Sequence, residues 1–118
     1  MAKYERSFFG RLDDFVPYLD RAILSGSMTA SVEDSTDVMA GDARVVVRVY
    51  ERFAASTRSR VSLNITAVGW GSQIYVSAIT SGGTEAMFTK IFTLGEDTFL
   101  DKAVQAIDAF GATGFERR

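Results

Sequence analysis

The sequence predicts a two-layer α+β domain, in which two helices lie on one face of a curved antiparallel sheet of about six strands. Several segments alternate apolar and polar residues with the period of a half-buried strand. Two further segments, one near each end of the chain, carry apolar residues at helical spacing. The chain has 118 residues, of which 47% are hydrophobic and 24% charged, so one domain with a buried core is expected.

The N-terminal part of the chain predicts a strand and then a helix. Residues 4–9 alternate as a short strand, which Gly10 ends. The apolar stripe of the helix consists of Leu12, Phe15, Val16, Leu19, Ala22 and Ile23. Asp13 is the expected N-cap and Gly26 the expected stop. Pro17 is expected near the first turn, where its missing amide hydrogen costs least.

The next two strands are expected at residues 28–33 and 43–53, with a turn at Gly41-Asp42 between them. The second of these is the clearest strand in the chain. The side chains expected to face the core are Val45, Val47 and Val49. The side chains expected to point away from the helices are Arg44, Arg48, Tyr50 and Arg52.

A hairpin at residues 60–81 is the expected centre of the sheet, with its turn at residues 69–72. Its first strand alternates the apolar Val61, Leu63, Ile65 and Ala67 with the polar Ser62, Asn64 and Thr66. Its second strand places Ile74, Val76 and Ala78 on one face and Tyr75, Ser77 and Ile79 on the other. One face of this hairpin is therefore expected to be buried and the other wetter.

The C-terminal part predicts a last strand at residues 86–92 and a long helix. Thr93 and Glu96 match a capping box just before that helix. Its apolar stripe consists of Phe99, Leu100, Ala103, Val104, Ile107 and Phe110. Gly111 is the expected end of the helix. We therefore expect a single domain over residues 1–112 and a flexible tail over residues 113–118.

The amino-acid composition of the chain argues against several classes of function. The net charge of −2 argues against a nucleic-acid partner, and no apolar run long enough to cross a bilayer is present, so a cytoplasmic protein without a membrane partner is expected. The chain has no cysteine and no histidine, which removes the commonest nucleophile, general base and zinc ligands. No cofactor is expected. An enzyme is disfavoured, although tyrosine, lysine or carboxylates leave catalysis open.

The arginine side of the third strand is the candidate site for an anion. Guanidinium groups suit phosphate and carboxylate groups, and neighbouring polar side chains would complete the site. The candidate residues are Arg44, Arg48, Tyr50, Arg52, Asn64 and Tyr75. The alternative is a solvated face on which these arginines pair with acidic neighbours.

Two other features could bind a partner or a metal ion. Trp70 lies between two glycines and is expected either to anchor a partner or to fold back over an edge of the sheet. Asp34, Asp37 and Asp42 could bind a hard cation, but their spacing does not match a calcium-binding loop. A solvated acidic loop is expected there, and no metal site.

Two resemblances extend this interpretation. The order of strands and helices resembles the TATA-box-binding-protein-like and helix-grip arrangements, in which a long C-terminal helix lies across a sheet. Four motifs resemble a family of short bacterial proteins of unknown function: Gly41-Asp42, residues 49–53, residues 61–64 and residues 77–83. This resemblance spans nearly the whole chain and implies a stand-alone, bacterial, cytoplasmic domain with no known substrate. Pro17 departs from the usual pattern of the first helix in that family.

The sequence leaves a choice of functions. The first is a non-enzymatic binding or interaction domain, which acts through its arginine-rich sheet face or by self-association as a homodimer. The alternative is a carrier that, as in helix-grip proteins, holds a small apolar or anionic ligand between the sheet and the C-terminal helix. The abundant large apolar side chains favour a filled core over such a cavity.

Overall fold

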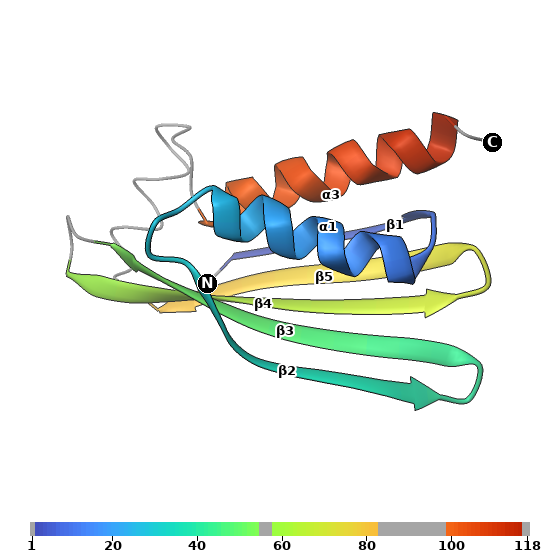
Figure 1. Ribbon diagram of the computed structural model, residues 1–118, viewed down its shortest axis with the longest axis horizontal. Coiled ribbons are helices and arrows are strands. Elements are labelled where there is room, and N and C mark those ends of the chain that lie inside the picture. The colour runs from blue at the N-terminus through green and yellow to red at the C-terminus, as the bar shows by residue number, and fades with distance from the viewer. Residues whose placement is uncertain (1, 55–57, 83–98, 117–118) are drawn as a thin grey trace.

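The computed structural model describes residues 2–54, 58–82 and 99–116, and shows the expected α+β fold (Figure 1). Its elements are, in order, β1 (Ala2–Phe9), α1 (Leu12–Ser25), β2 (Ser31–Ala40), β3 (Ala43–Ala54), β4 (Ser59–Trp70), β5 (Gln73–Gly82) and α3 (Phe99–Glu116). The strand predicted at residues 86–92 and the capping box at Thr93 and Glu96 lie outside the described residues.

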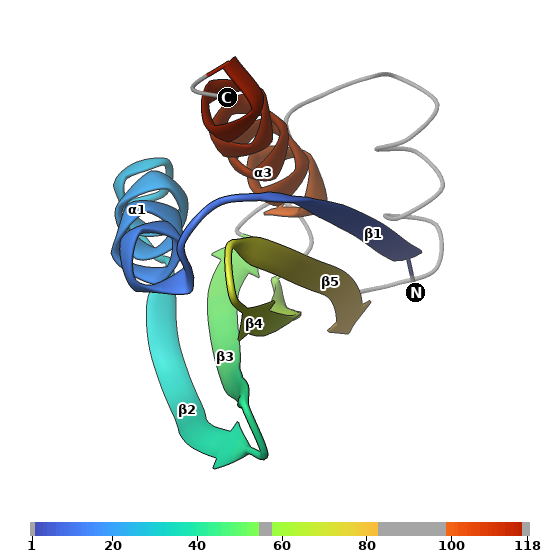
Figure 2. The same cartoon turned by 90° about the vertical axis from the view of Figure 1, so that its right-hand side faces the viewer.

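The five described strands form one antiparallel sheet in the order β1-β5-β4-β3-β2. Both helices lie on the same face of this twisted sheet, and the β2–β3 side extends past them (Figure 2). The turn at Gly41-Asp42 connects adjacent strands, as predicted. The turn of the central hairpin is shorter than predicted, because β4 continues through Gly69 and Trp70 and only Gly71-Ser72 form the turn. Gly41 and Gly71 have φ of 63° and 58°, a conformation that favours glycine. β2 runs on to Ala40, so Asp34 and Asp37 belong to a strand and not to an acidic loop.

The core lies between the sheet and the helices. The prediction for the central hairpin is confirmed, because Leu63, Ile65 and Ile74 are fully buried on the helix side. Four aromatic rings fill the space between the two helices and the end of β1. Phe110 of α3 lies 5.9 Å from Phe8, 5.1 Å from Phe15 and 5.2 Å from Tyr18, measured between ring centroids. The contacts of Phe110 with Phe8 and Phe15 are edge-on, a geometry that stabilises the core beyond the area that it buries.

The start of α1 differs from the prediction. Arg11 occupies the N-cap position without a side-chain hydrogen bond, and Asp13 lies inside the first turn. A carboxylate is favourable there because it interacts with the partial positive charge of the helix start. Pro17 lies within the helix on its exposed side. The helix ends at Gly26, as predicted.

The end of α3 also differs, because the helix continues through Gly111 to Glu116. A Cβ atom on Gly111 would lie 3.1 Å from Cζ of Arg6. Glycine at this position therefore leaves room for the guanidinium group of Arg6 and does not mark the end of the helix. Within the described ranges, no helix is both long and apolar enough to span a bilayer.

Candidate functional site

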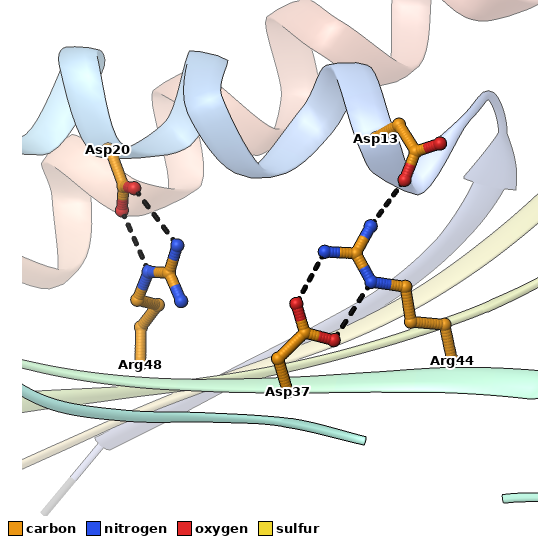
Figure 3. Close-up of polar contacts among 5 residues, drawn as sticks. All are labelled: Asp13, Asp20, Asp37, Arg44 and Arg48. Atoms are coloured by element: carbon orange, nitrogen blue, oxygen red, sulfur yellow. Dashed lines mark hydrogen bonds and ion pairs between the residues drawn. The ribbon is translucent and has the colours of Figure 1, made fainter. Parts of the chain in front are cut away.

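The arginine side of β3 faces the helices, so the predicted orientation of this strand is wrong. Val46 and Tyr50 are the fully buried side chains of β3, and Arg44 and Arg48 reach α1 (Figure 3). Val45, Val47 and Val49 point to the opposite face and are only half-buried. The reversal follows from the pairing of β3 with β4, which places Tyr50 directly opposite the buried Leu63.

Arg44 is held by two carboxylates. Its Nε and Nη2 atoms donate to the two carboxylate oxygens of Asp37 on β2, at 2.9 and 2.6 Å, and its Nη1 donates to Asp13 on α1 (Figure 3). The hydrogen bonds from Arg44 lower the pKa of Asp37 below its ordinary value. These three hydrogen bonds use most of the N–H groups with which the Arg44 guanidinium would bind an anion.

Arg48 and Tyr50 converge on Asp20 of α1. Arg48 donates from Nε and Nη2 to the two oxygens of Asp20, at 3.2 and 3.3 Å, and the Tyr50 hydroxyl also donates to Oδ1 of Asp20. Burial, followed by the hydrogen bond to Asp20, raises the pKa of the Tyr50 hydroxyl well above its ordinary value. The hydroxyl therefore stays neutral across the physiological pH range.

A second cluster repeats this arrangement at β1. Tyr4 and Arg6 both donate to Oδ1 of Asp108 on α3, with an Arg6 distance of 2.7 Å. In both clusters a tyrosine and an arginine, two positions apart on a strand, share one helical aspartate. The hydrogen bond to Asp108 raises the pKa of the Tyr4 hydroxyl. We call the two clusters the aspartate clamps, because each joins a strand to a helix.

The fold does not bring the predicted anion-site residues together. Arg52 lies on the helix side with Arg44, Arg48 and Tyr50, its Cζ atom 5.0 Å from the ring centroid of Phe99. Asn64 and Tyr75 lie on the opposite face of the sheet, where Asn64 accepts from Thr66 and Tyr75 donates to Glu5. The predicted single polar face is therefore split between two sides of the sheet.

The face of the sheet away from the helices, which we call the open face, carries the other notable feature. Among the described elements, none lies over it (Figures 1 and 2). Strand pairing places one complete row of side chains across it: Lys3, Ile79, Asn64, Val49 and Asp34. The charged members of this row are therefore at the two edges of the sheet.

The centre of the open face is formed by side chains of β3, β4 and β5 that carry no charge. We call this the uncharged patch. It consists of Ala43, Val45, Val47, Val49, Asn64, Thr66, Val68, Trp70, Gln73, Tyr75, Ser77 and Ile79. Trp70 lies at one end of it and is 42% exposed. The open face of an antiparallel sheet is usually polar, so an uncharged mixture of valines, aromatic rings and small polar groups is notable.

The sequence contained a signal for the orientation of β3 that periodicity alone does not use. Asp13 and Asp20 are seven positions apart, so they lie on one side of α1 about 10.5 Å apart along its axis. Arg44 and Arg48 are about 13 Å apart along β3. The two spacings differ by less than the length of an arginine side chain, so each arginine can reach one of the two aspartates. The alternation of valines in β3 instead predicted that the valines face the core, which is the wrong face.

No curated protein matches the chain. A family model described as a family of unknown function (DUF6054) matches residues 1–111, which is nearly the whole chain. The expected resemblance to a family of unknown function is therefore confirmed, and the chain belongs to DUF6054.

Proposed function

We propose that this protein is a non-enzymatic interaction domain, which binds a protein partner through the uncharged patch of its open sheet face. The observation that carries the proposal is the distribution of charge on this face. The patch itself carries no charged side chain, and the charged side chains of the open face surround it. Lys3, Glu5 and Asp34 lie at the edges of the sheet, and the ion pair of Glu51 with Arg60 lies beyond the end of the patch.

This distribution is typical of a protein interface. Interface centres are depleted in charged residues and enriched in aromatic ones, and polar residues surround them. Trp70 and Tyr75 supply the kind of side chain that most often dominates binding energy. Val45, Val47 and Val49 add apolar area that the domain's own core does not bury.

The geometry favours this function over an anion site, a ligand carrier and an enzyme. An anion would have to displace the carboxylates that hold Arg44 and Arg48. A carried ligand would need room between the sheet and α3, where Phe8, Phe15 and Phe110 pack against one another. For catalysis, the chain has neither histidine nor cysteine, and both aspartates of the clamps are occupied by tyrosine and arginine donors.

A photo-crosslinking experiment in cells of the native host tests the proposal. A photoreactive amino acid replaces Thr66, in the middle of the patch, or Gln105, an exposed residue of α3, as a matched control. We expect a discrete cross-linked protein from position 66 and none from position 105. Equal labelling from both positions, or none from position 66, would contradict the proposal.

A further inference from the structure

We propose that the partner bound by the uncharged patch is a second copy of this chain, packed face to face about a twofold axis that runs parallel to β4. This inference rests on the proposed function, because it uses the same surface. It adds the identity of the partner and the way in which the two sheets are aligned.

The edge charges select this axis. In a face-to-face dimer the twofold axis lies in the plane between the two sheets. An axis along β4 lays β1 of each copy over β2 of the other. Lys3 and Asp34 occupy the two ends of one row across the sheet, so each Lys3 comes over the Asp34 of the second copy. The dimer then contains this pair of opposite charges twice.

Other arrangements of two copies lack this complementarity. An axis perpendicular to the strands lays β1 over β1, and an axis through the row of Glu5 then brings the two Glu5 carboxylates together. Edge-to-edge pairing of two β2 strands would leave the uncharged patch of both copies exposed to water. The charges and the exposed patch therefore favour face-to-face packing about the axis along β4.

The same axis gives the uncharged groups of the patch suitable neighbours. β5 comes over β3 of the second copy, so Tyr75 lies over Val45 and Ile79 over Val49. Asn64 and Thr66 of β4 lie beside their own counterparts. Amide and hydroxyl groups both donate and accept, so such pairs can satisfy each other.

The open face is large enough for such a dimer. Five strands at about 4.8 Å spacing and about ten residues at about 3.3 Å give roughly 24 by 33 Å, or about 800 Å² per copy. This is the area that each partner buries in an interface of standard size.

Analytical ultracentrifugation of the purified chain tests the proposal first, with Thr66→Lys and Gln105→Lys as matched variants. A dimer is expected for the unchanged chain and for Gln105→Lys. Thr66→Lys places two lysines on the axis within an uncharged interface, so its dimer is expected to be at least about 100-fold weaker. A chain that is monomeric up to about 1 mM, or a dimer that Thr66→Lys leaves intact, would overturn the inference.

A charge exchange at the edges tests the axis without disturbing the core. Lys3→Glu alone sets like charges over each other twice, as does Asp34→Lys alone, and each dimer is expected to be about tenfold weaker. A mixture of the two variants restores both opposite pairs, so native mass spectrometry should show more heterodimer than random exchange gives. A random ratio would overturn the proposed axis.

The two proposals fail in distinguishable ways. If photo-crosslinking at Thr66 captures only a different protein and the purified chain is monomeric, the self-association inference is wrong and the proposed function stands. If neither Thr66 labelling nor a dimer is found, both are wrong.

Discussion

At the scale of single residues, two aspartates join the sheet to its helices. Asp20 accepts hydrogen bonds from Arg48 and Tyr50, and Asp108 accepts them from Tyr4 and Arg6. Hydrogen bonds with an ionised partner are stronger than neutral ones, and partial burial raises the cost of leaving any member without a partner. These residues therefore explain stability rather than recognition.

Tyr50→Phe should destabilise the protein by about 1–2 kcal/mol, because it removes a hydrogen bond from a buried hydroxyl to a carboxylate while keeping the ring in the core. Urea unfolding at neutral pH measures the change. Tyr75→Phe is the matched control, because the hydroxyl of Tyr75 donates to the exposed Glu5 on the open face. An equal loss in the two variants would contradict a special role for the Tyr50 hydroxyl.

The raised pKa of Tyr50 predicts the response to alkali. Above the ordinary tyrosine pKa of 10.0, Tyr50 loses its proton in the unfolded chain but keeps it in the folded one. Stability is therefore complete below pH 10 and falls as the pH rises further, by up to about 1.4 kcal/mol per pH unit for this group. Tyr50→Phe should decline less steeply in unfolding experiments from pH 9 to 11. If the stability of Tyr50→Phe and of the unchanged chain declined equally steeply above pH 10, the loss could not come from the Tyr50 hydroxyl.

The residues of β3 and β4 show what sequence patterns can predict. Residues 61–67 of β4 alternate strictly between apolar and small polar side chains, and the buried face of this stretch was predicted correctly. β3 has apolar side chains on both faces, so hydrophobicity alone could not choose between Val47 and Tyr50. The choice depends on the pairing of β3 with β4 and on α1, whose carboxylates accept hydrogen bonds from Arg44 and Arg48 on the helix side. Both are contacts between distant segments, which a local pattern does not contain.

At the scale of elements, two ion pairs join α1 to β3, and they differ in how exposed they are to water. The side chain of Asp20 is 26% exposed, whereas that of Asp13 is 64% exposed and its partner Arg44 also pairs with Asp37. We therefore expect the middle of α1, and not its start, to hold the helix against β3.

Asp20→Ala should cost about 2–3 kcal/mol, because it leaves the Tyr50 hydroxyl and the Arg48 guanidinium without their carboxylate. Asp13→Ala should cost less than about 1 kcal/mol, because Arg44 keeps Asp37. Urea unfolding compares the two, and amide hydrogen exchange should accelerate across α1 in Asp20→Ala only. A larger loss of stability from Asp13→Ala than from Asp20→Ala would show that the exposed ion pair of Asp13 holds the helix against the sheet.

The start of α1 packs so closely on β4 that Gly69 has no room for a side chain. A Cβ atom there would lie 2.8 Å from Cβ of Leu12, a buried residue. Gly69→Ala should therefore lower the free energy of unfolding by about 1–3 kcal/mol. Gly26→Ala is the control, because its Cβ would meet only the flexible end of Lys102. A neutral Gly69→Ala would mean that the helix start shifts freely.

At the scale of the whole molecule, the sequence predicted the α+β class and the order of the described elements, because local periodicity and turn residues determine them. The predicted site depended on which face of the sheet each strand presents. Because the orientation of β3 is the reverse of the predicted one, Arg44 and Arg48 lie on the helix side. Uncharged side chains of β3 lie on the open face, where these arginines were predicted. A site that combines several strands is therefore more sensitive to one error than the fold is.

The proposed dimer predicts that thermal stability depends on protein concentration. Association stabilises the folded state by mass action, so the unfolding midpoint of a dimer rises as the protein is concentrated. Trp70 is the one tryptophan in the sequence and lies at the end of the uncharged patch, so its fluorescence reports both unfolding and association. We expect the midpoint to rise by several degrees over a 100-fold concentration range. Gln105→Lys should keep this dependence and Thr66→Lys should lose it. A midpoint that stays constant in the unchanged chain would contradict the dimer.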